Sequence, residues 1–268
     1  MRQRVAPAGP PPTVLVFAPR ERTRAVARET FPRRRWRLVV RRTVDDFGRS
    51  FREELIDAAI VDLASAQEEN WQAAALAREY PSVPFFALTT LRATDGPVLA
   101  QCAALDFADV LVEDVDEEAM RELVLRQAYT TRFARALSRP PRPLALKTEL
   151  QVGAWQYVVG HAGRPVRTAS LAEALGVTRE HLSRTFSAGG APNLKRIIDL
   201  VRLIGAAELA KNPGYDVRDV ARVLGFASSS HLSSTAQRIA STRPASLARL
   251  RTVDLIERFN RGHGRSRG

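Results

Sequence analysis

The sequence predicts an α/β domain followed by an all-α domain, and three observations support this division. In the first half, short apolar segments such as Thr13–Ala18 and Asp57–Leu63 alternate with amphipathic segments, a pattern typical of parallel strands covered by helices. After Thr148 the alternation gives way to helical periodicity. Between the halves, Ser138–Pro143 contains three prolines, which favour an extended connection. A chain of 268 residues is long enough for two hydrophobic cores.

Five segments are expected along the chain. They are a disordered N-terminus at 1–12, the α/β domain at 13–137, a proline-rich linker at 138–147, the helical domain at 148–252, and a helix end with a basic tail at 253–268.

Charge is distributed unevenly between the two halves. Residues 139–268 contain 21 Lys and Arg against 9 Asp and Glu, whereas residues 1–138 contain 20 of each. A neutral domain joined to a strongly basic one suggests a regulatory or scaffolding part attached to a polyanion-binding part. Within the neutral half, the basic run Pro32–Arg37 could contact DNA or an acidic partner, although a solvated sheet edge is the simpler interpretation.

Composition also argues against several classes of protein. The apolar runs are too short to span a bilayer, and the first twelve residues lack the apolar segment of a secretory signal. The single Cys102 excludes an internal disulfide and, with four histidines, argues against a zinc site. There is no glycine-rich phosphate loop and no Ser/His/Asp arrangement. We therefore expect a cytoplasmic protein that is not an enzyme, with no metal, no cofactor and no membrane partner.

The first half is expected to form a doubly wound five-stranded parallel sheet, whose function collects at the carboxyl ends of the strands. The expected strands are Thr13–Ala18, Arg37–Arg42, Asp57–Leu63, Pro84–Thr89 and Ala108–Val112, and the expected helices are Arg22–Thr30, Val44–Leu55, Asn70–Tyr80, Gly96–Leu105 and Asp116–Ala136.

Residues 13–137 resemble a response-regulator receiver domain. Asp62, at the end of the third strand, stands where receivers have their phosphoacceptor, and Thr89 stands where they have a hydroxyl residue that reports phosphorylation. Two departures are expected to abolish that chemistry. Ala18-Pro19-Arg20 replaces the acidic residues that hold magnesium, and Glu113-Asp114 replaces a lysine and proline.

Phosphoryl transfer to a carboxylate depends on a divalent cation and a positive side chain. Magnesium favours more than one carboxylate, and Glu113 adds a negative charge where a receiver has a positive one. We therefore expect Asp62 to cap a loop within a phosphorylation-independent pseudo-receiver, used for homodimerisation or for binding a protein partner. A true phosphorylated two-component receiver is the alternative for this half.

The basic half contains two helix-turn-helix patterns. In the first, Ser170 and Glu173 are expected to cap a helix that ends at Gly176. Val177 is expected in the core, Thr178 as the cap of the next helix, and Leu182 and Phe186 on its buried face.

The second pattern, Asp216–Ile239, repeats this arrangement around Gly225, with Val217 and Leu232 expected to point inward, and Asn193–Lys211 is expected to be a long helix between the two units. Together, "LAEALGVTREHLSRTF", Arg202 with "LIGAAELA", "VARVLGF" and "RPASLARLR" resemble the DNA-binding domain of AraC-family transcription regulators over residues 148–251. The resemblance implies two recognition helices entering successive major grooves of double-stranded DNA, about 34 Å apart.

The resemblance places the DNA-contacting face by position. Arg184 is expected to pair with guanine or to contact a phosphate, Arg179 to meet the DNA backbone, and Glu180 to accept from cytosine or to lie off the DNA. The complete expected set is Arg179, Glu180, Ser183 and Arg184 on the first helix, and Ser229, Ser230, Ser233 and Ser234 on the second.

The second unit departs from the family, with Ala236 in place of a core phenylalanine and Ser241 in place of a glycine. Serines discriminate poorly between bases, so we expect the second unit to anchor the protein while the first selects sequence. The predicted protein is a bacterial transcription regulator. The alternative from another class is an interaction adaptor that binds DNA only nonspecifically.

Overall fold

The computed structural model describes residues 9–264 except residues 66, 114, 116 and 189. The expected disorder of residues 1–8 and the last four residues of the expected tail lie outside the described residues. The described residues divide into two compact units, a sheet unit of Pro11–Arg132 with Asn212–Tyr215 and a helical unit of residues 9–10, 133–211 and 216–264. The domain limits expected from the sequence stay a prediction.

The sheet unit has the predicted fold, a five-stranded parallel sheet in the order β2-β1-β3-β4-β5. Each observed strand limit lies within one residue of its predicted position. Strands β1, β3 and β4 are fully buried, as their apolar runs predict. The elements are β1 Thr13–Phe17, α1 Glu21–Thr30, β2 Arg37–Arg41, α2 Val44–Glu53, β3 Ala58–Asp62, α3 Glu68–Ala75, η1 Leu76–Arg78, β4 Phe85–Thr89, α4 Gly96–Ala104, β5 Asp109–Val112 and α5 Glu117–Gln127.

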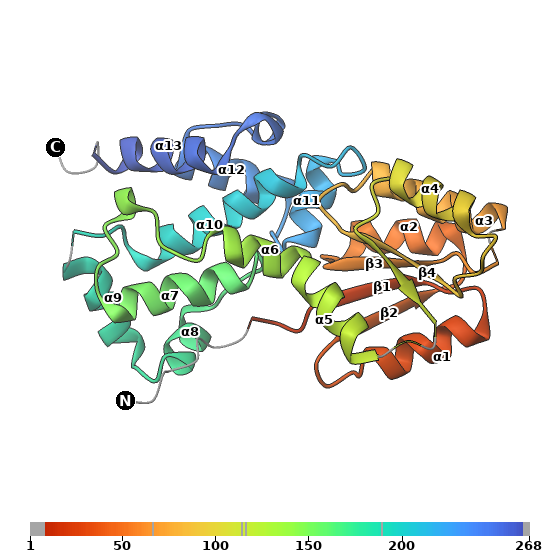
Figure 1. Ribbon diagram of the computed structural model, residues 1–268. Helices are drawn as coiled ribbons and strands as arrows, with labels where there is room; N and C mark the ends of the chain where they lie inside the picture. Colours follow the sequence, from red (N-terminus) through yellow and green to blue (C-terminus); the bar gives the residue numbers. More distant parts are fainter. Residues whose placement is uncertain (1–8, 66, 114, 116, 189, 265–268) are drawn as a thin grey trace. The chain divides into compact units, whose positions relative to one another are not determined.

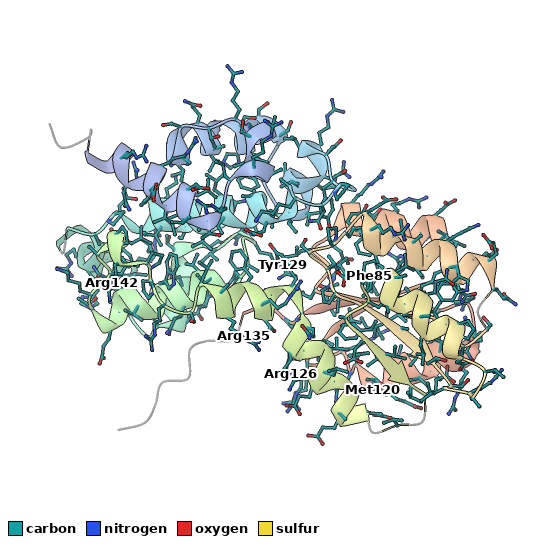
Figure 2. The ribbon with its side chains drawn as sticks, turned by 45° about the horizontal axis from the view of Figure 1, so that its top comes forward. Phe85, Met120, Arg126, Tyr129, Arg135 and Arg142 are labelled. Carbon is teal, nitrogen blue, oxygen red and sulfur yellow. The ribbon has the colours of Figure 1, made fainter. Side chains whose placement is uncertain are left out.

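Helices cover both faces of this sheet, with α1 and α5 on one side and α2, α3 and α4 on the other (Figure 1). Phe86 and Met120 belong to the core beneath α1 and α5. On the opposite face, Phe51 stacks on Phe85 with ring centroids 5.6 Å apart and meets Phe47 edge-on at 5.5 Å. Figure 2 labels Phe85 and Met120, one residue from each core.

The expected single helix at 116–136 is wrong, because the helix is interrupted at Ala128 between α5 and α6 (Tyr129–Ala136). The side chain and backbone of Asp57 cause the interruption. The Tyr129 amide donates to the Asp57 carbonyl at 2.8 Å, and the Thr130 amide donates to the Asp57 carboxylate at 2.9 Å. These two amides are thereby taken from the helical ladder and tied to the start of β3.

The helical unit is built around one long buried helix, α10, which packs against α7, α11, α12 and α13. Its N-cap is Asn193, whose side chain accepts from the Arg196 amide. Its close approach to the turn after α7 needs glycine, because a Cβ on Gly205 would lie 3.1 Å from the Gly163 Cα atom. The elements are η2 Arg142–Leu144, α7 Glu149–Gly160, α8 Thr168–Ala174, α9 Arg179–Ala188, α10 Leu194–Leu209, α11 Val217–Val223, α12 Ser229–Ala240, η3 Pro244–Arg249 and α13 Thr252–Gly264.

Three local expectations for this unit are wrong. Helix α8 begins at Thr168 with Arg167 at its N-cap, so Ser170 lies inside the helix and does not cap it. Val217 is 36% exposed because it is the first residue of α11 and precedes the buried stripe. The basic tail from Asn260 onward, which was expected to be loose, is helical as far as Gly264, since the buried side chain of Phe259 holds α13 in the core. Within the described ranges, no helix combines the length and apolar character needed to cross a membrane.

Candidate functional site

The first helix-turn-helix is formed by α8 and α9. Gly176 makes the turn with φ +68°, a conformation that glycine adopts without steric cost. The Thr178 hydroxyl then caps α9 by accepting from the His181 amide at 3.2 Å. Leu182 and Phe186 are fully buried and hold α9 against the unit. These roles of Gly176, Thr178, Leu182 and Phe186 confirm the sequence prediction.

The four residues expected to contact DNA from α9 lie together on its outer surface. Arg179, Glu180, Ser183 and Arg184 are all exposed. Two arginines within the first two turns make this surface locally basic, with Glu180 as the single acid among the four. The geometry is suitable for insertion into a DNA groove, while the role of each side chain stays a prediction.

The second helix-turn-helix is formed by α11 and α12 and is capped at both helix starts. Asp216 and Asp219 form a reciprocal capping box at the start of α11. Gly225 makes the turn with φ +61°, and a Cβ there would lie 2.8 Å from the Pro165 Cγ atom. The Ser228 hydroxyl accepts from the His231 amide at 3.1 Å and so begins α12.

The serines of α12 are less available than the sequence suggests. Ser230 and Ser234 are exposed, whereas Ser229 and Ser233 are half-buried. The Ser233 hydroxyl donates to the Ser229 carbonyl and the Ser234 hydroxyl donates to the His231 carbonyl, both at 3.0 Å. Each of these hydroxyls therefore donates its only proton to a carbonyl of its own helix. In this arrangement each can only accept a further hydrogen bond.

Helix α12 ends in a backbone conformation that disfavours its residue. Ser241, the C-cap, has φ +47° and ψ +46°, the left-handed region in which glycine is preferred. The resemblance described above implies a glycine at this position. The structure shows that the backbone keeps the conformation that glycine would adopt more readily.

A different arrangement occupies the carboxyl end of the sheet. Asp62 is fully buried at the end of β3, and the Arg20 guanidinium grips its carboxylate, with Nε at 2.8 Å and Nη2 at 2.6 Å. The same Nη2 atom also donates to the Glu113 carboxylate. The Thr23 hydroxyl donates to Asp62 as well, and the Ala64 amide donates to it at 3.2 Å.

Arg20 thus occupies the position in which a cation would meet Asp62. Burial lowers the pKa of Arg20, but its hydrogen bonds and charge interactions with Asp62 and Glu113 outweigh this effect and raise the pKa above its usual value. The guanidinium therefore remains charged and neutralises part of two carboxylates. The Asp62 carboxylate also accepts from a loop amide, as the loop-capping interpretation expects.

Thr89, the other expected receiver residue, does not bond to Asp62. Its hydroxyl is directed to Asp95 at 3.4 Å and accepts from the Leu91 amide at 3.3 Å. Asp114 lies outside the described residues. Arg20 was visible in the sequence beside Pro19, but nothing there indicated that it pairs with residues 42 and 93 positions away.

The comparison with known families decides the nature of the helical unit. A family model described as a helix-turn-helix domain matches residues 171–249. The chain carries an AraC-type helix-turn-helix domain. A comparison with curated protein sequences returns no match.

Solved structures of regulators are similar to the chain at low identity. A response regulator from Thermotoga maritima is 16% identical and covers 44% of this chain and 97% of its own, with a TM-score of 0.38. Full-length FixJ from B. japonicum is 12% identical and covers 70% and 94%, with a TM-score of 0.38. The xylose-binding transcription activator xylR is 14% identical and covers 88% and 69%, with a TM-score of 0.34.

One residue that organises the AraC-type domain was not predicted to do so. Arg202 of α10 is 8% exposed, and its Nη2 atom donates to the carbonyls of Leu224 and Gly225, each at 3.1 Å. Its guanidinium carbon lies 3.9 Å above the centre of the Phe226 ring. Burial lowers the pKa of Arg202, with the nearby Asp199 acting in the opposite direction. Arg202 therefore fixes the turn that aims α12.

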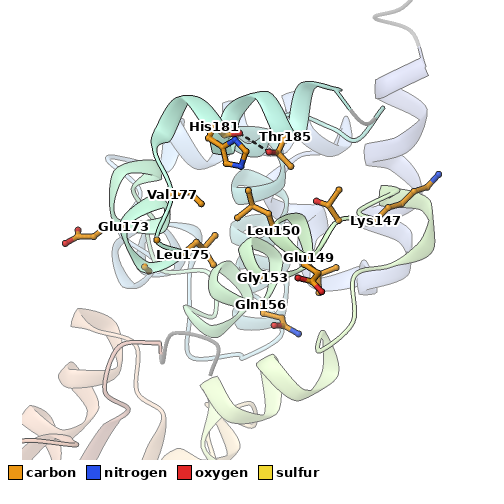
Figure 3. Close-up of a pocket in the computed structure, with 14 residues that line it drawn as sticks. Lys147, Glu149, Leu150, Gly153, Gln156, Glu173, Leu175, Val177, His181 and Thr185 are labelled. Atoms are coloured by element: carbon orange, nitrogen blue, oxygen red, sulfur yellow. Dashed lines mark hydrogen bonds between the residues drawn. The ribbon is translucent and has the colours of Figure 1, made fainter. Parts of the chain in front are cut away.

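A hollow of about 980 Å³ lies beside α9 of the AraC-type domain (Figure 3). Leu150 and Leu175 contribute apolar walls, and His181 and Thr185 face it from α9. Val177 lines this hollow and is only half-buried, which corrects the expectation that it is a core residue. The gap between α7 and the turn explains the exposure, because no described side chain fills it.

Proposed function

We propose that this protein is a sequence-specific transcription regulator whose N-terminal unit works without phosphorylation. An AraC-type domain supports DNA binding and transcription regulation. The observation that carries the finer proposal is the buried contact of Arg20 with Asp62 and Glu113. The proposed site of action is the cytoplasm, at the nucleoid when the protein is bound to DNA.

On DNA, α9 selects the sequence and α12 anchors the complex. Arg184 is long, exposed and cationic, and a bidentate contact to guanine provides about 1–3 kcal/mol of discrimination. On α12, the hydroxyl protons of Ser233 and Ser234 are already engaged with their own helix. Serines that can only accept contribute little choice between bases. Arg179 at the start of α9 is assigned to the phosphate backbone.

The test is a comparison of Arg184→Ala with Ser233→Ala on a binding site mapped from bound genomic DNA. Fluorescence anisotropy should show that Arg184→Ala weakens the preference for the site over base-pair variants by about 5- to 150-fold at one position. Ser233→Ala should leave that preference within about twofold. Equal losses would contradict the division of roles, and a wild-type protein with no preferred site would support the nonspecific adaptor instead.

In the N-terminal unit, Arg20 occupies the carboxylate that a divalent cation would have to bind for phosphoryl transfer. Its guanidinium covers the Asp62 carboxylate, and Glu113 places a second carboxylate in the same cluster. An incoming phosphoryl group would meet an aspartate that is already paired. Incubation with radiolabelled acetyl phosphate should therefore leave the wild-type protein unlabelled. Labelling that Asp62→Ala removes would establish a true receiver.

The N-terminal unit is also proposed to pair with a second copy of the chain. Among its described residues, the exposed large apolar side chains are Leu91, Leu99, Val115 and Leu125. These come from the elements around edge strand β5, namely the β4–α4 connection, α4, the β5–α5 connection and α5.

Exposed apolar side chains on elements around one sheet edge are typical of an interaction surface. Light scattering after size exclusion should give a dimer that Leu99→Glu with Leu125→Glu converts to monomer. A monomeric wild-type protein would contradict homodimerisation and would assign this surface to the binding of a different protein.

A further inference from the structure

A rigid turn at the edge of the sheet unit presents three consecutive arginines. Arg33, Arg34 and Arg35 follow Pro32, whose carbonyl accepts from the Arg35 amide at 3.0 Å and the Trp36 amide at 3.2 Å. All three arginines are exposed. We call Arg33–Arg35 the arginine turn.

Buried aromatic residues on both sides fix this turn to the core. Phe31 and Trp36 are 2% and 5% exposed, and their rings meet edge-on with centroids 5.1 Å apart. The Arg37 amide donates to the Pro12 carbonyl at 3.0 Å, which starts β2 directly after the turn. The backbone positions of the three charges are therefore set by the fold, so little backbone entropy is lost when a ligand binds them.

Several other arginines of the sheet unit form ion pairs with acidic side chains. Arg24 pairs with Glu21, Arg37 with Glu54, Arg49 with Asp46 and Arg121 with Glu117. Among the residues that the structure describes, the three side chains of the arginine turn take part in no ion pair. Three adjacent positive charges without internal compensation attract an anionic partner with several closely spaced charges.

We propose that the arginine turn contacts the phosphate backbone of DNA flanking the site bound by the AraC-type domain. The inference rests on the proposed DNA-binding function. Both units belong to one chain, so DNA held by the helical unit is present at high effective concentration around the sheet unit. A duplex offers regularly spaced phosphates, and arginine is well suited to contact them. An acidic protein segment lacks that tethering advantage.

The experiment compares three variants of the full-length chain on duplexes with short and long flanks around the mapped site. The first is R33A/R34A/R35A, and the second replaces the same three residues with lysine. The matched control is R42A/R78A/R92A, which removes three exposed arginines from the same unit at dispersed positions. Affinity is measured by anisotropy from 50 to 300 mM salt.

Each lost phosphate contact reduces the slope of log affinity against log salt by about 0.9, which corresponds to about fivefold in affinity at 0.15 M salt. On long duplexes, the slope of log affinity against log salt should be smaller by about 1 to 3 for the alanine variant than for the wild-type protein. The alanine variant should also lose the gain in affinity that the wild-type protein obtains from longer flanks. The lysine variant and the control should keep both, because the lysine variant retains the local charge and the control retains the turn.

An unchanged slope for R33A/R34A/R35A, or an equal loss in R42A/R78A/R92A, would overturn the proposal. If the arginine turn instead binds an acidic protein, the slope for R33A/R34A/R35A on DNA would be unchanged. Failure of the underlying function gives a separate result, in which the wild-type protein does not distinguish the mapped site from unrelated DNA. Thermal unfolding of each variant confirms that the exposed substitutions leave the fold intact.

Discussion

Replacing Arg20 with methionine tests whether its guanidinium neutralises the carboxylates at the carboxyl end of the sheet. The substitution keeps an unbranched side chain but leaves two buried carboxylates, Asp62 and Glu113, without their shared donor. Breaking a buried ion pair costs about 3–5 kcal/mol. The Arg20 side chain is 29% exposed, and solvent therefore screens part of this interaction. We expect a loss of about 2–4 kcal/mol in the free energy of unfolding at pH 7.

The loss should depend on pH, because the variant can relieve the repulsion by binding a proton. The deficit should therefore shrink as the pH falls from 7 to 5.

Hydrogen exchange measured by mass spectrometry provides the assay, because it reports on β1, β3 and β5 separately from the helical unit. A loss of 2–4 kcal/mol corresponds to roughly 30- to 1000-fold faster exchange in these strands. Arg49→Met is the control, since its ion pair with Asp46 is exposed on both sides and is worth less than about 0.5 kcal/mol. An Arg20→Met protein as stable as the wild type at both pH values would refute the neutralising role of Arg20.

Two further substitutions test the helical unit. Ser241→Gly should raise the free energy of unfolding by about 1 kcal/mol, because glycine adopts the positive φ at the end of α12 without a Cβ penalty; urea denaturation provides the measurement. Arg202→Met should lower it by about 2–3 kcal/mol and weaken DNA binding, because the Leu224 and Gly225 carbonyls lose their buried donor; urea denaturation and anisotropy provide the two measurements.

Each of these expectations has a result that contradicts it. A less stable Ser241→Gly protein would mean that serine makes compensating contacts at the cap. If Arg202→Met keeps full DNA affinity, the contacts of Arg202 at the turn are not needed for DNA binding. Ser241→Ala serves as the comparison for the first variant, since it retains the Cβ atom and removes only the hydroxyl.

The features predicted correctly are those that depend on neighbouring residues in the sequence. The β3 strand follows from a local run of apolar residues, and Gly176 and Gly225 mark turns because their backbone requires positive φ. The cap of α8 was misplaced because both Arg167 and Ser170 can precede a helical segment. Such local alternatives are separated only by how the helix packs.

The features that were missed depend on contacts distant in the sequence. Asp57 interrupts the helix that would have run past Ala128, through bonds to residues 72 and 73 positions later. Arg20 reaches Asp62 and Glu113 across the tops of the strands in the same way. Sequence showed which charges were missing from the receiver pattern, but not which side chain of the chain replaces them.

The central helix α10 restricts how the protein can change over evolutionary time. Its 16 residues rise about 24 Å between the two helix-turn-helix units. One inserted residue would lengthen that separation by about 1.5 Å and rotate one unit by about 100° against the other. Substitutions within α10 would alter packing gradually, whereas a single insertion or deletion would change the rotation of α9 relative to α12. A change in the relative placement of the two helix-turn-helix units therefore demands remodelling of the whole helix.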